Sequence, residues 1–110
     1  MPSFVPRYLE PYQKKELLDK RIGELRVAIR KGVAFSRASR LAEKVRSAAL
    51  AVIKAKRTIL KSQPAFLGRP PGDPKREGIA RQLAKLEAEA GRWNSRSTDD
   101  IVGEYTESVS

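Results

Sequence analysis

The chain contains neither cysteine nor histidine among its 110 residues. The absence of cysteine excludes disulfide bonds and thiolate chemistry. Without either residue type, the usual zinc sites and most nucleophile–base pairs are excluded as well. We therefore expect no metal, no cofactor and no small-molecule substrate, and we expect that the protein is not an enzyme.

Long apolar runs are also absent. The longest is Ala48–Ile53, which is far shorter than the ~20 residues that a membrane-spanning helix needs. The first eleven residues, MPSFVPRYLEP, lack the basic region followed by an apolar region that marks a secretory signal. We expect a cytoplasmic protein without a membrane span.

Acidic residues are few compared with basic ones. The chain has 13 Asp and Glu against 23 Lys and Arg, for a net charge of +10. Such an excess indicates a polyanionic partner, RNA or DNA first of all, and says nothing about the fold. Most of it lies between Lys14 and Lys61, where fifteen basic residues stand against four acidic ones.

The clearest periodic stretch covers residues 36–61 and predicts one long helix. Apolar residues recur there at three- and four-residue steps, as on one face of a helix. Ser36 fits the N-cap position, because its hydroxyl can accept a hydrogen bond from an amide of the first turn. The opposite face is basic, so this helix is expected to supply both core and basic surface.

A second helix is predicted over residues 12–31, where Leu18, Ile22, Leu25 and Ile29 form a seam with 4-3-4 spacing. Gly32 suits the position that ends this helix, because glycine enters the left-handed region without penalty. The join to residue 36 is short. A short join makes the two helices antiparallel neighbours, so residues 14–61 are expected to form a long basic hairpin.

A third helix is predicted over residues 74–92, after a proline-rich loop at 62–74. Asp73 fits its N-cap and Pro74 its first position. Its apolar stripe is narrow, so the helix is expected to pack across the hairpin and to face one groove, such as that between the first two helices.

The two ends of the chain carry different patterns. Three prolines in residues 1–11 predict an extended arm. Residues 94–110 are polar and increasingly acidic, without a sustained apolar period, and predict a flexible acidic tail. The expected fold is therefore all-α, with a three-helix domain over residues 12–93 between an arm and a tail.

The join between the first two helices carries a further pattern. Residues 28–41, AIRKGVAFSRASRL, resemble the helix-turn-helix of bacterial repressors, with the characteristic places taken by Ala28, Gly32, Val33, Ser39 and Arg40. This resemblance implies that Arg37, Ser39 and Arg40 face the major groove of DNA. Lys31 departs from the pattern, which prefers an apolar residue there. A plain helical hairpin with a glycine cap is the alternative interpretation.

The sequence thus favours a non-enzymatic, nucleic-acid-binding subunit of a larger assembly, with RNA and DNA both open. It is expected to contact the phosphate backbone through the hairpin. The predicted contacts are Arg26, Arg30, Lys31, Arg37, Arg40, Lys44, Lys54, Arg57 and Lys61. Two alternatives remain at this point: an adaptor that docks an acidic protein partner, and a helix-turn-helix DNA-binding regulator.

Overall fold

The computed structural model describes the backbone of residues 9–109 and the side chains of residues 9–106. This part of the chain is all-α, as predicted, and contains no strand. Residues 1–8 of the expected arm lie outside the described residues. The helices are α1 (Glu10–Lys31), α2 (Phe35–Ser62), α3 (Pro64–Leu67), α4 (Pro74–Ser95) and α5 (Thr98–Val109).

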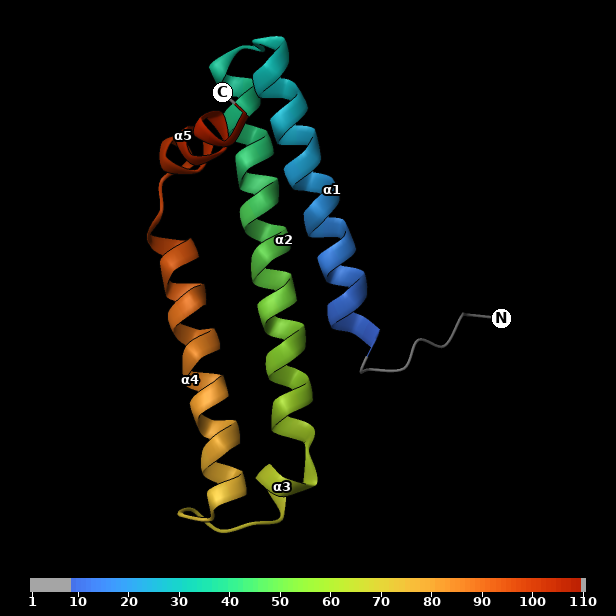
Figure 1. Cartoon of the computed structure of the whole chain (residues 1–110), viewed down its shortest axis with the longest axis vertical. Coiled ribbons are helices and arrows are strands. Elements are labelled where there is room, and N and C mark those ends of the chain that lie inside the picture. Colours follow the sequence, from blue (N-terminus) through green and yellow to red (C-terminus); the bar gives the residue numbers. More distant parts are fainter. Residues whose placement is uncertain (1–8, 110) are drawn as a thin grey trace, which may run out of the picture.

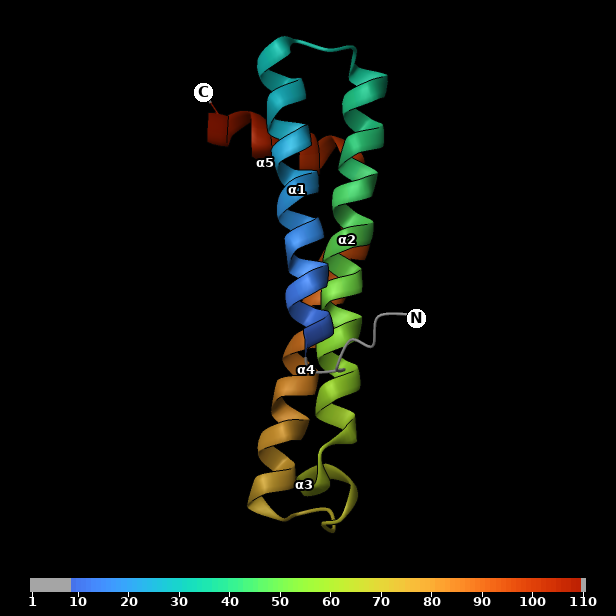
Figure 2. The same cartoon turned by 90° about the vertical axis from the view of Figure 1, so that its right-hand side faces the viewer.

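The helices form two layers (Figures 1 and 2). One layer is the antiparallel hairpin of α1 and α2, which lie side by side. The other layer consists of α4, which runs along α2, and α5, which crosses behind the hairpin near its turn in the view of Figure 2. No described helix covers the opposite side of the hairpin, which faces the viewer in Figure 2.

The hairpin turn follows from Gly32, which has φ +68°. At this angle glycine avoids the steric cost that a side chain would bring, and its amide donates to the carbonyls of Ala28 and Ile29. The predicted N-cap of the next helix is wrong. Helix α2 begins one residue before Ser36, and its N-cap is Ala34, which makes no side-chain capping bond.

The best-packed part of the core lies where α5 crosses the hairpin. Leu25, Val45 and Ile101 are completely buried there, one from each of α1, α2 and α5. Ala38 and Ala42 lie in the same cluster. Because the distance between packed helices depends on the side chains at the contact, these alanines let the neighbouring helices approach α2 closely.

The helix predicted over residues 74–92 is α4, and it does not pack in the groove that the sequence analysis suggested for it. Helix α4 packs along α2 and buries Ile79 and Leu83, and it does not lie in the groove between α1 and α2. Its narrow apolar stripe suffices for one neighbour. Its start is as predicted: the carboxylate of Asp73 accepts a hydrogen bond of 2.9 Å from the amide of Lys75. The loop before it contains α3, which was not predicted.

The expected flexible tail is wrong for residues 98–109, which form α5. Its start is fixed by a reciprocal pair of hydrogen bonds: the Ser97 hydroxyl accepts from the Asp100 amide at 3.1 Å, and the Asp100 carboxylate accepts from the Ser97 amide at 3.3 Å. This arrangement is a capping box. Helix α5 then docks through Ile101, with Val102 and Tyr105 packed against the same core cluster.

Candidate nucleic-acid interface

Helix α2 is the most basic element of the fold, with eight Lys and Arg residues and a single acidic residue, Glu43. The contacts of their side chains divide the eight into two groups. Arg46, Lys56 and Arg57 turn towards the layer of α4 and α5 or towards the cleft beside it. The other five are exposed and form no ion pair with α4 or α5 within the described residues, and we call them the basic row: Arg37, Arg40, Lys44, Lys54 and Lys61.

The basic row is one continuous stripe. Its members are separated by steps of three, four, ten and seven residues, all of which return to one face of an α-helix. The other positions on that face are Ser47, Ala51 and Thr58, which are small, and Glu43, which pairs with Arg46. With a rise of 1.5 Å per residue, the row is about 36 Å long.

All five side chains of the basic row are exposed. None of them forms an ion pair with an acidic side chain within residues 9–106, where Glu43 pairs with Arg46 instead. The row therefore presents positive charge that the described part of the protein does not neutralise.

Two grooves beside the row extend the basic surface onto α1. One is lined by Lys31 and Arg37, and the other by Lys14, Arg21 and Lys44, and neither has a lining residue from α4 or α5. The acidic side chains of the grooves are Glu24 and Glu43. Each of these forms an ion pair with a neighbouring arginine on its own helix.

Sequence reasoning missed Lys14 and Arg21 as members of this surface. The available signal was weak. Their positions on α1 border the buried seam and therefore face the edge of α2, but only the antiparallel alignment of the two helices brings them beside Lys44.

Three of the predicted contact residues lie apart from the row. The guanidinium of Arg57 points to α4, where Nη2 donates to Oε1 of Glu87 at 3.3 Å. Arg26 lies over the ring of Tyr105 in α5, 5.5 Å from its centroid. Arg30 is exposed on α1 and lines neither groove. The structure thus separates Arg26, Arg30 and Arg57 from Lys31 and the row.

The helix-turn-helix geometry is not present. That motif joins two helices at about 90–120°, so that the second projects into the major groove. Here α1 and α2 lie side by side along the hairpin (Figure 2). Arg37 and Arg40 therefore lie on the flank of a long hairpin and not on a projecting recognition helix.

The acidic helix α5 lies behind the hairpin in the view of Figure 2 and packs on both α1 and α2. Its Glu104 forms an ion pair with Arg96, in which Oε2 lies 2.8 Å from Nη1 of the guanidinium. Burial raises the pKa of the Tyr105 hydroxyl above 10.0, and the negative charge of Glu104 acts in the same direction. None of the described acidic side chains of α5 forms an ion pair with the basic row.

Comparisons with protein-family models, with curated proteins and with solved structures give no match. In the part of the chain that the structure describes, no helix is long and apolar enough to cross a membrane. The same part holds no group of three acidic side chains placed to bind a metal ion.

Proposed function

We propose that the protein binds RNA or DNA, as a non-enzymatic subunit of a larger assembly, through the basic row of α2 and the adjacent Lys14, Arg21 and Lys31 of α1. The observation that carries this proposal is the row itself: five exposed cations along about 36 Å of one helix face, unpaired among the described residues. Nucleic acid is the partner class that matches a line of positive charge, because its phosphates form a line of negative charge.

The proposed side chains contact the phosphate backbone and do not recognise the base sequence. On α2 the surface consists of Lys and Arg separated by Ser47, Ala51, Thr58 and Glu43, which pairs with Arg46, and it has no aromatic residue on which bases would stack. Binding is then driven by the release of counterions from the nucleic acid, so it weakens steeply as salt is added.

The test replaces Arg40, Lys44 and Lys54 with Gln in one variant. Gln has a helix propensity close to those of Lys and Arg, so the hairpin is expected to remain folded. For duplex DNA, the slope of log affinity against log salt should decrease by about 0.9 for each lost phosphate contact, and by about 0.7 for a single strand. Fluorescence anisotropy with labelled RNA and DNA measures both slopes.

The matched control replaces Lys75, Arg81 and Arg92 with Gln. These residues are exposed on α4, form no ion pair in the described part of the chain, and their loss changes the net charge equally. The proposal expects a much smaller change in slope for this variant. An equal change in both variants, or no binding by the wild-type protein at low salt, would contradict it.

A further inference from the structure

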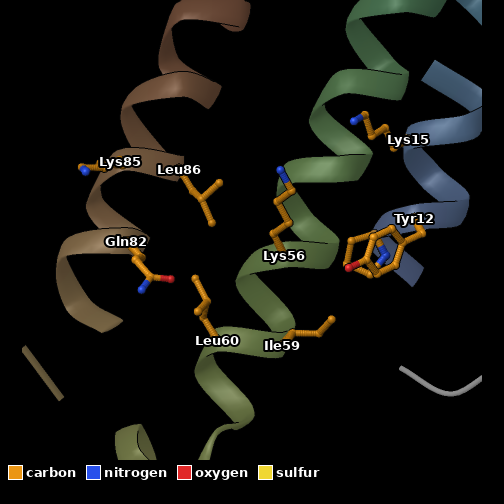
Figure 3. Close-up of a pocket in the computed structure, with 9 residues that line it drawn as sticks. Tyr12, Lys15, Lys56, Ile59, Leu60, Gln82, Lys85 and Leu86 are labelled. Carbon is orange, nitrogen blue, oxygen red and sulfur yellow. The ribbon is translucent and has the colours of Figure 1, made fainter. Parts of the chain in front are cut away.

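A second surface lies on the other side of α2, between the start of α1 and the middle of α4 (Figure 3). It is a cleft of about 600 Å³. We call it the lysine cleft, and its principal residues are Lys15, Lys56, Ile59, Leu60, Lys85 and Leu86. In Figure 3, Lys56 stands between the two walls, and Leu86 reaches from α4 towards α2.

The cleft follows from the way the helices pack. Helices α1 and α4 each pack on α2, but over their described lengths they do not form an interface with each other. Near the hairpin turn, α5 covers the hairpin by packing on both α1 and α2. Towards the other end of α2 the corresponding space holds no described helix, and apolar side chains of α2 and α4 line it.

The lining of the cleft combines apolar contact with one sign of charge. Its apolar surface comes from Ile59, Leu60 and Leu86, together with Pro11 and the ring of Tyr12. A lysine is contributed by each of the three helices around it, and no lining residue is acidic. An occupant that matches this surface is apolar on one side and negatively charged beside it.

The protein contains an example of such an occupant in α5. This helix places Ile101 in the core between α1 and α2, while Asp99, Asp100 and Glu104 remain exposed. Its acidic side also meets cations, as Glu104 pairs with Arg96 at 2.8 Å. The space near the turn is therefore filled by a short acidic helix with an apolar face. The lysine cleft, with its apolar and basic lining, suits a helix of the same kind.

We infer that the lysine cleft binds an acidic amphipathic helix from a partner protein. The apolar face of that helix packs on Leu60 and Leu86, and its carboxylates lie near Lys15, Lys56 and Lys85. This is the helix-in-groove mode of recognition. The site is separate from the basic row, so the protein is able to hold nucleic acid and a protein partner at the same time.

The probe is a synthetic 18-residue helical peptide with leucine on one face and glutamate on the other, labelled with fluorescein. A second peptide carries lysine in place of glutamate. The cleft variant replaces Lys15, Lys56 and Lys85 with Glu. The control variant replaces Lys20, Lys61 and Lys75 with Glu, which removes one exposed lysine from each of the same three helices. Anisotropy gives the affinities, and backbone amide NMR shifts give the site.

The acidic peptide should bind the wild-type protein with shifts centred on residues 56–60 and 82–86. The cleft variant should bind it at least tenfold more weakly than the control variant does, and should prefer the basic peptide, because reversal of charge converts attraction into repulsion. Leu86→Glu should weaken the binding of the acidic peptide when it is made in the wild-type protein, and the binding of the basic peptide when it is made in the cleft variant.

Several results would overturn the inference. One is equal weakening in the cleft and control variants, and another is a set of shifts that follows the basic row. Absence of peptide binding at low salt would do the same. So would saturation of the cleft by oleate but not by the peptide, which would indicate an anionic lipid, or a dimer that the cleft variant abolishes, which would indicate a second copy of this chain.

Discussion

The two flanks of α2 use the same kind of residue in opposite ways. On the flank towards α4 and α5, the guanidinium of Arg46 donates to the backbone carbonyl of Arg96 and pairs with Glu43, and Arg57 pairs with Glu87. On the other flank, the five cations of the basic row have no acidic partner within residues 9–106. A basic side chain on one helix therefore serves folding or is left free for a partner, according to what packs beside it.

The strongest test of the covered flank is Ile101→Ala. Ile101 is 0% exposed and joins α5 to the hairpin. Its truncation is expected to lower the free energy of unfolding by about 2–5 kcal/mol, because transfer and cavity terms add at a buried site. Chemical denaturation measures this loss. Val27→Ala, at a site that is 45% exposed, is the control and should cost far less. Similar losses at both sites would mean that α5 does not contribute to the core.

The next test compares Arg46 with Arg40. Arg46→Gln should destabilise the protein by about 1–3 kcal/mol, since it leaves the Arg96 carbonyl without its donor in a partly buried position. Arg40→Gln should change stability by less than about 0.5 kcal/mol, because Arg40 is exposed and forms no ion pair within residues 9–106. The two thermal midpoints decide the matter. If they move equally, the division of the two flanks into structural and free cations is wrong.

A smaller effect is expected at Gly23, on the side of the hairpin that no described helix covers. Gly23 lies inside α1, and a Cβ at this position would have no heavy atom within 4 Å. Gly23→Ala should therefore stabilise the protein by about 0.5–1 kcal/mol, through the helix propensity of alanine. Gly32→Ala, at φ +68°, should destabilise it. A loss of stability in the first variant would reveal an unseen contact on that side.

The smallest effect is expected from Tyr105 at alkaline pH. Burial raises the pKa of its hydroxyl in the folded state, so the unfolded chain loses this proton first. The stability that Tyr105 contributes is complete below its usual pKa of 10.0 and is lost as pH rises through the raised value. Tyr105→Phe cannot titrate, so its stability should fall less steeply between about pH 9 and pH 11 than that of the wild type. Parallel curves would argue against burial of the hydroxyl.

The helices α1, α2 and α4 could be predicted from the sequence because their signals are local. Apolar spacing, Gly32 and Asp73 act over a few residues, and each feature works without knowledge of its neighbours. The signal for α5 was local too: Ser97 and Asp100 form a capping box directly before Ile101. The acidic composition of the same segment, however, is also typical of disordered chains, and this opposing signal predicts a tail.

By itself, the sequence determined which side chains share a helix face, and hence that Arg37, Arg40, Lys44, Lys54, Arg57 and Lys61 lie along one side of α2. Only the tertiary structure decided which faces are covered. It placed α4 beside α2, turned Arg57 towards Glu87, docked α5 on the hairpin and left the lysine cleft open. The physical reason is that helical periodicity is fixed by the backbone of one segment, whereas the choice of neighbour depends on how whole surfaces from distant segments fit together.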